Sequence, residues 1–184
     1  MKAPTNADVL LAALDSAAAK CVDWLPVPSG RTVRLLTSDT ADAVSQAVWT
    51  RVTERLEDRG IVVKCAGDSA DFRLSVFPMT AGIVYERGDP AGFLRKRDIR
   101  RTAQAALAVR LEDLGNGLSR AETLRVHRTD RLPFSALDEV ERDGRFFLKP
   151  ARPAPGSSWR WIEPLALASA MAWIVFAFYS MRSD

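Results

Sequence analysis

The feature that most constrains this chain is an uncharged apolar stretch near its C-terminal end. The 17 residues from Leu165 to Met181 include no charged residue and no proline. As an α-helix they would extend about 25 Å, and residues 162–164 bring the helix close to the roughly 30 Å of a bilayer core. The sequence therefore predicts a transmembrane helix over residues 162–181. The alternative is a buried C-terminal helix of a soluble domain.

The residues around and within this stretch suit a membrane span. Trp159 and Trp161 precede it and Tyr179 lies near its end, as expected of aromatic residues at the two membrane interfaces. Small residues four positions apart would let a second membrane helix approach closely; they are Ala166 with Ala170 and Ala168 with Ala172. A plain lipid-facing anchor is the alternative to such packing.

The N-terminal region does not have the pattern of a signal peptide. The apolar run Val9 to Leu14 is short and is bracketed by Asp8 and Asp15. We therefore expect a tail-anchored, single-pass bacterial protein of the inner (cytoplasmic) membrane. Basic residues before the span place the domain in the cytoplasm by the positive-inside rule; the periplasmic side is the alternative.

The remaining residues are enough for one domain with its own core. We expect a soluble domain over residues 1–149 and a proline-rich linker over residues 150–161. The net charge of +3 is mildly basic and does not by itself require a nucleic-acid partner.

Apolar periodicity predicts the elements of the domain. Residues 5–20 read as a helix with Thr5 and Asp8 as a capping box, and residues 41–59 read as a helix that Gly60 ends. Residues 31–37 and 61–63 read as strands. From Asp71 the apolar residues alternate, Pro78 interrupts the strand, and residues 81–86 resume it. Ser135 is expected to cap a short helix over residues 135–141.

Residues 99–114 fit a helix or a strand. The alternation through Leu107, Val109 and Leu111, followed by the turn residues 115–117, favours a long antiparallel hairpin with residues 118–129. The element order predicts an α+β fold, with a largely antiparallel sheet and helices on one face.

A resemblance to a known family covers residues 31–129. A strand and a helix ending in Arg59-Gly60 lead to the segments Ala70 to Leu74, Arg101 to Ala103 and Val109 to Gly117. This order resembles the bacterial envelope domains of the curli-secretion and transport-auxiliary lipoprotein type. The resemblance implies a strand–helix–strand start, a long hairpin and a non-enzymatic role in assembly.

The sequence offers no recognisable catalytic, cofactor-binding or metal-binding motif. His127 lies in a basic run and reads as a surface residue of a strand. Cys21 and Cys65 read as small buried side chains, and a disulfide between them would need an oxidising compartment. We assign no catalytic, cofactor or metal residues, and we expect a protein that is not an enzyme.

The strongest polar feature is a basic run of Arg95, Lys96, Arg97, Arg100 and Arg101. Such a patch would bind an acidic partner protein or anionic lipid headgroups. Nucleic acid is the least favoured ligand because the run lacks interleaved aromatic residues. A solvated strand face is the alternative to all three.

These observations favour a non-enzymatic accessory subunit of a larger integral membrane complex, which could be secretory, respiratory or photosynthetic. Its partners would be membrane lipid and other integral membrane subunits. The alternative is a membrane-tethered module that recruits an anionic ligand through the basic run. An enzyme with an unrecognised site is a third hypothesis.

Overall fold

The computed structural model describes residues 3–36, 42–64, 69–87, 98–142 and 150–152. The chain divides into two units, Met1–Arg152 and Pro153–Asp184. The second unit, which contains the predicted span 162–181 and most of the predicted linker, lies outside the described residues. Within the described ranges, no helix is both long enough and apolar enough to cross a membrane.

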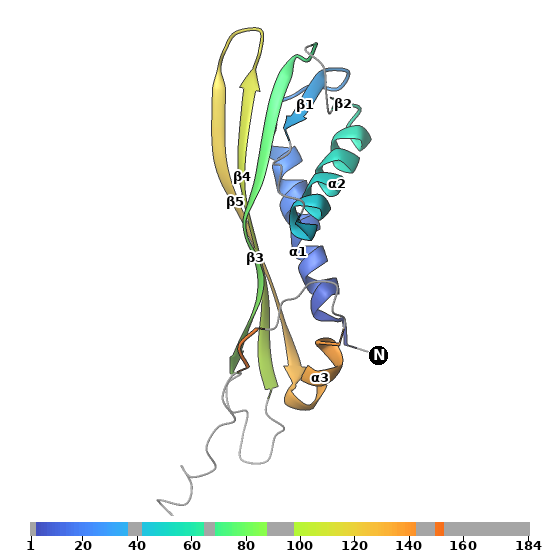
Figure 1. Ribbon diagram of the computed structural model, residues 1–184, viewed down its shortest axis with the longest axis vertical. Coiled ribbons are helices and arrows are strands. Elements are labelled where there is room, and N and C mark those ends of the chain that lie inside the picture. The colour runs from blue at the N-terminus through green and yellow to red at the C-terminus, as the bar shows by residue number, and fades with distance from the viewer. Residues whose placement is uncertain (1–2, 37–41, 65–68, 88–97, 143–149, 153–184) are drawn as a thin grey trace, which may run out of the picture. The chain divides into compact units, whose positions relative to one another are not determined.

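The first unit is a mixed α/β fold built on a five-stranded sheet (Figure 1). The sheet order is β2-β1-β3-β4-β5, with β1 parallel to both of its neighbours and β3, β4 and β5 forming an antiparallel ribbon. The elements are α1 (Asn6–Trp24), β1 (Thr32–Leu36), α2 (Ala43–Asp58), β2 (Val62–Lys64), β3 (Phe72–Arg87), β4 (Asp98–Asp113), β5 (Ser119–Pro133), the 3-10 turn Phe134–Ala136 and α3 (Leu137–Val140).

The ends of the two long helices follow from local chemistry. The Thr5 side chain accepts from the backbone N–H of Asp8, and the Asp8 carboxylate accepts from the backbone N–H of Thr5, which is the capping box that the sequence predicts. The helix α1 runs on to Trp24, beyond the predicted end, because Cys21 and Val22 extend its buried face. Helix α2 stops before Gly60, whose φ of +73° is costly for any other residue.

Pro78 does not divide β3 into two strands, and the expected interruption is instead a β-bulge. The pairing with β4 shifts register between Pro78 and Thr80. Before the bulge Leu74 and Val76 are buried, and after it Ile83 and Tyr85 are buried. The extra residue changes which positions of β3 face the helices, from even-numbered before the bulge to odd-numbered after it. One continuous strand therefore keeps its apolar side toward the helices.

The hairpin over residues 98–133 confirms the strand interpretation of residues 99–114, and the helical alternative is wrong. Every second residue of β4 from Ile99 to Leu111 is buried, and none of the intervening residues is. That period of two is possible only in a strand with one covered face. The short helix after β5 begins as a 3-10 turn, and Ser135 does not cap it.

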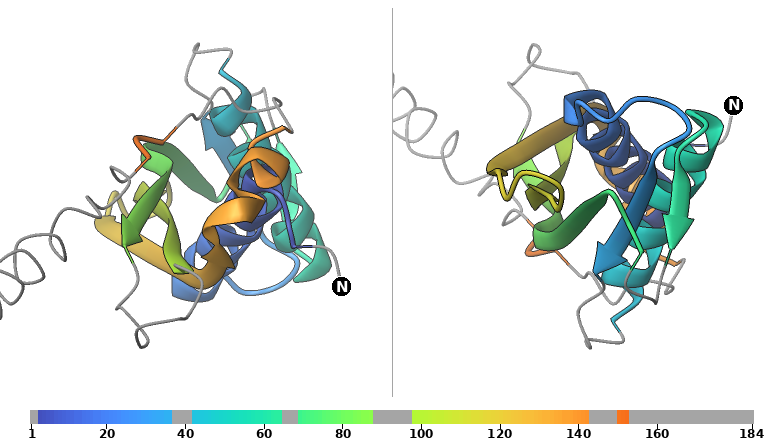
Figure 2. Two further views of the ribbon diagram at one scale, coloured as in Figure 1. Left: turned by 90° about the horizontal axis from the view of Figure 1, so that it is seen from below. Right: turned by 90° about the horizontal axis from the view of Figure 1, so that it is seen from above.

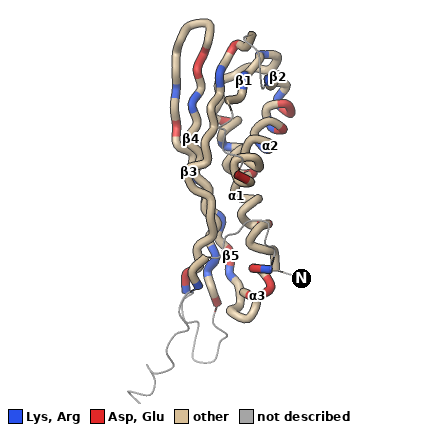
Figure 3. Tube along the Cα trace, viewed as in Figure 1, with Lys and Arg blue, Asp and Glu red and all other residues tan. Residues whose placement is uncertain are grey.

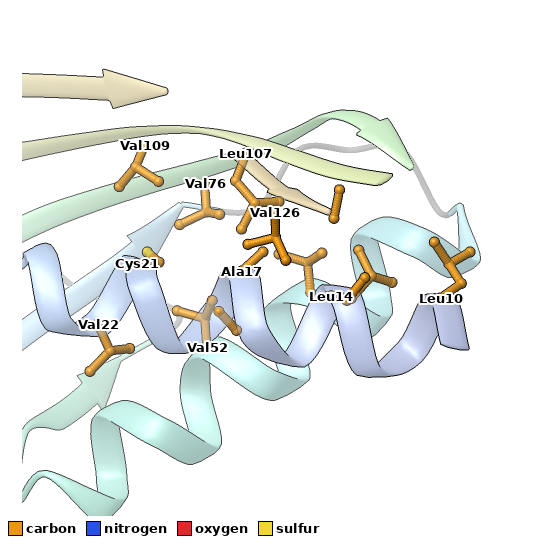
Figure 4. Packing of buried hydrophobic residues seen from close by; sticks show 14 of the residues in the cluster. Leu10, Leu14, Ala17, Cys21, Val22, Val52, Val76, Leu107, Val109 and Val126 are labelled. Carbon is orange, nitrogen blue, oxygen red and sulfur yellow. The ribbon is translucent and has the colours of Figure 1, made fainter. Parts of the chain in front are cut away.

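The core lies between the helices and the inner face of the sheet. Figure 4 shows Leu14 and Ala17 of α1 directed toward Leu107 and Val126 of the β4–β5 hairpin. The second helix, α2, packs on α1 and on β3 and β2. The end-on views in Figure 2 show both long helices on the same side of the ribbon.

Cys21 is a buried free thiol inside this core, as the sequence suggests. Burial raises the pKa of the Cys21 thiol to about 12. At neutral pH the side chain is therefore a small apolar group rather than a nucleophile. Cys65 lies outside the described residues.

The two glycines Gly60 and Gly82 provide a matched test of the helix stop. A Gly60→Ala substitution should lower the free energy of unfolding by about 1 kcal/mol, because it places a Cβ in the left-handed region. Gly82 has an ordinary φ, and a Cβ added there would meet nothing within 4 Å, so Gly82→Ala should not destabilise the fold. Chemical denaturation of both full-length variants in detergent measures the difference, and equal midpoints would contradict it.

Candidate docking surface

One face of the β3–β4–β5 ribbon is left open by the helices. We call this face the open face; it carries the even-numbered residues of β4 and their cross-strand neighbours. None of its residues in the described strands is buried, whereas the opposite face supplies most of the core. An antiparallel sheet with one solvated face normally presents polar residues there.

The middle of the open face is not polar. Phe77, Ala108 and Thr123 lie side by side across the three strands, and Ala121 lies in the next row beside Arg110. These side chains, together with Val109, Arg110 and Glu122, line a shallow groove of about 370 Å³. Ala108 and Ala121 contribute small side chains to its lining, so a partner can approach the backbone of the sheet closely over these two residues.

Exposed apolar side chains continue along β3 from this groove. Phe77 is 44% exposed, Met79 is 62% exposed and Val84 is 40% exposed. Charged residues of the same face lie mostly toward its two ends and its β5 side; they include Arg73, Glu86, Arg100, Arg110, Glu112, Arg125 and Arg131. An apolar centre with a charged periphery is the anatomy of a protein–protein contact surface.

The basic run does not form one surface patch. Arg101 is fully buried on the helix side of β4, because neighbouring residues of a strand point to opposite faces and Arg100 takes the exposed side. Burial removes Arg101 from the predicted binding patch, which corrects that part of the prediction. Arg95, Lys96 and Arg97 lie outside the described residues.

Arg101 instead links the start of α1 to strands β4 and β5. Its Nε donates to Asp130 Oδ1 at 2.9 Å and its Nη2 donates to Asp130 Oδ2, which makes a two-pronged ion pair between β4 and β5. Its Nη1 donates at 3.0 Å to the Pro4 carbonyl oxygen and at 3.0 Å to Asn6 Oδ1. The guanidinium thus fastens the start of α1 to the sheet.

The network extends through Asn6 to the end of β3. Asn6 Nδ2 donates to Tyr85 Oη at 2.7 Å in a buried contact. Burial raises the pKa of Tyr85, so its hydroxyl stays protonated at neutral pH. Nearby, Arg152 donates to Asp138 Oδ1 at 2.8 Å and to Glu141. The point where the chain leaves the domain is therefore held against α3.

The other residues singled out in the sequence fall in three places. His127 is exposed on β5, as predicted. Cys21 is in the core. The predicted helix-packing and interface residues lie outside the described residues; they are Ala166, Ala168, Ala170, Ala172, Trp159, Trp161 and Tyr179.

The residues of the open face were not predicted from the sequence, although a signal for them exists. Phe77 falls at the polar parity of β3, beside Arg73 and Ser75, and Arg101 falls at the apolar parity of β4. An apolar residue on the polar side marks an exposed contact, and a charged residue on the apolar side marks a buried pair. Reading each exception to the alternation in this way identifies both features.

Comparisons with known proteins give a weak structural similarity. No model of a known protein family matches the chain, and no curated protein matches it. Among solved structures, the chain is similar to a minor lipoprotein from Acinetobacter baumannii at 13% identity and a TM-score of 0.39, over 59% of this chain and 76% of that protein. So low a likeness carries no functional argument, and the resemblance to curli-secretion domains stays a prediction.

The adjacent arginines Arg100 and Arg101 should respond differently to the same substitution. Arg101→Met removes the ion pair with Asp130 and one hydrogen bond to Asn6, which keeps its contact with Tyr85, and should cost about 3 kcal/mol of unfolding free energy. Arg100→Met removes an exposed charge and should change stability by less than about 0.5 kcal/mol. Thermal unfolding of the two full-length variants checks this, and similar stabilities would show that the Arg101 network contributes little.

Proposed function

We propose that this chain is a non-enzymatic, membrane-anchored accessory subunit of a larger integral membrane complex. Residues 162–181 would anchor it in the inner membrane with the domain on the cytoplasmic side. The open face of the sheet would cover part of the surface of the complex. The complex could be secretory, respiratory or photosynthetic.

The observation that carries the proposal is the apolar centre of the open face. Phe77 exposes a large side chain in a groove that Ala108 and Ala121 also line, with Arg110 and Glu122 as its charged lining residues, and Met79 exposes a second large side chain nearby in β3. Aromatic residues and methionine are enriched in the centres of protein interfaces, and charged residues are depleted there. A surface with this composition is better suited to a protein partner than to water.

The length of the linker limits where this partner can be. Arg152 is held on α3 by Asp138 and Glu141, and nine residues separate it from the predicted span at residue 162. Nine extended residues reach at most about 30 Å. If the span is inserted, the domain stays next to the bilayer, where the available partners are other membrane proteins and lipid headgroups.

The basic-patch hypothesis loses support relative to this one. With Arg101 paired inside the domain, the described part of the run presents only Arg100, with Arg131 of β5 opposite it. Recruitment of an anionic ligand through this run therefore ranks below docking through the open face.

A purification in mild detergent tests the proposal. The tagged full-length protein should bring down a defined membrane complex, and a Phe77→Asp variant should lower the recovery of that complex about tenfold or more, since it places a charge at the centre of the contact. A matched variant, Thr129→Asp, puts the same charge at an exposed position on the same face, away from the groove, and should have a smaller effect.

A span-swapped protein distinguishes the two membrane contacts. If residues 165–181 are replaced by polyleucine, retention of the complex assigns the contact to the domain, and its loss assigns the contact to the helix. If the native protein is monomeric in mild detergent, the proposal of an accessory subunit is wrong.

A further inference from the structure

The strand β3 has a long edge that no described strand covers. Strand β1 pairs with β3 only from Phe72 to Ser75, whereas β3 continues to Arg87. Over the residues after Ser75, β3 pairs on one side with β4, and in the described part of the chain no strand pairs on its other side. The ribbon therefore has two open edges, one formed by β3 and one by β5.

The β5 edge is protected in the way that natural sheets protect exposed edges. It carries four arginines, at positions 120, 125, 128 and 131, together with Glu122 and Asp130. Lys20 Nζ also donates to the carbonyl oxygen of Arg125 at 3.2 Å. Charges and a lysine on an edge discourage pairing with another strand.

The β3 edge has less of this protection: Pro78 and its bulge interrupt the edge at one point, and charged residues come only at Glu86 and Arg87. The twelve residues from Leu74 to Tyr85 include no charged residue, in a chain whose residues are 27% charged. The charged positions along the two edges can be compared in Figure 3. An uncharged strand edge with exposed apolar residues is a template for pairing, and its lack of charge suits a partner strand that is itself uncharged.

Two residues of β3 bear on where another strand could pair with this edge. Pro78 cannot donate a backbone hydrogen bond and lies at the bulge, so an added strand would pair only with the residues that follow it. Gly82 lies in the strand interior, and a Cβ added to it would meet nothing within 4 Å. A glycine inside a strand often marks a place where another backbone approaches closely.

A contact with helix α2 marks the N-terminal limit of the β3 edge that a partner strand could pair with. Trp49 Nε1 donates to the carbonyl oxygen of Val76 at 3.3 Å, just past the last residue that pairs with β1. Helix α2 thus occupies the edge at Val76. The segment left for a partner runs from Met79 to Arg87, long enough for an added strand of ordinary length.

We propose that a subunit of the partner complex adds an extended segment to β3 along residues 79–87, and that this segment is uncharged and apolar where it faces residues 79–85. This rests on the proposed function, because it names the contact by which the accessory subunit is held. Backbone pairing would supply the adhesion, and Val84 on the open face would contact alternate side chains of the added strand. The added strand would continue the sheet next to the groove at Phe77.

Amide hydrogen exchange of the full-length protein tests this inference. In native membranes the amides of residues 79–87 should exchange about tenfold or more slowly than in the protein stripped of partners by detergent. A Val84→Lys variant, which places a charge on the edge strand, should abolish that protection. Its matched control, Thr129→Lys at an exposed position of β5 that does not line the groove, should leave the protection unchanged.

Each other outcome overturns the inference and says why. If Val84→Lys keeps both the complex and the protection, the edge is not the contact, although the accessory role stands. If the wild-type protein forms no complex, the proposed function itself fails. Protection that is already present in the stripped monomer would show that another part of this chain covers the edge, and protection that grows with protein concentration would assign it to a second copy. Unfolding midpoints of both variants confirm that the fold is intact.

Discussion

The fold depends on the packing of α1 against the inner face of the β4–β5 hairpin. Strand β4 contributes seven buried residues in strict alternation from Ile99 to Leu111, and α1 covers them with Leu10, Leu14 and its small residues Ala17 and Ala18. The small side chains let the helix lie close to the sheet. With α1 and α2 both on this side, no helix of the described residues covers the opposite face of the ribbon, and that asymmetry produces the candidate docking surface.

The same packed face includes one charged residue, Arg101. Arg101 occupies a position that alternation assigns to the core, and its burial is tolerable because four hydrogen bonds satisfy the guanidinium. A buried ion pair is weak evidence for stability, since an apolar replacement of both partners can do as well. Its effect here is geometric. The pair joins Pro4 and Asn6 to β4 and β5, which fixes where α1 begins relative to the sheet.

Local signals in the sequence were enough to predict most of the helices and strands. The capping box at Thr5 and the left-handed Gly60 could be read directly, because each acts within one turn of its helix. The bulge at Pro78 could not be predicted from the sequence. Whether a proline ends a strand or only forms a bulge in it depends on whether the neighbouring strand, here β4, continues to pair on both sides of it. The pairing of Arg101 with Asp130 also depends on strand register, 29 residues apart in the chain, which alternation on either strand alone does not provide.

The two edges of the ribbon differ in a way that the fold itself does not require. The four arginines on β5 contribute little to the core, since they are exposed, and they add repulsion along a single strand. Their physical effect is to keep that edge unpaired. The same substitution pattern was available to β3, where Met79 and Val84 are exposed and a lysine would cost little. The apolar character of the β3 edge is what the proposed partner strand would use, because backbone pairing is possible along an edge that charges do not block.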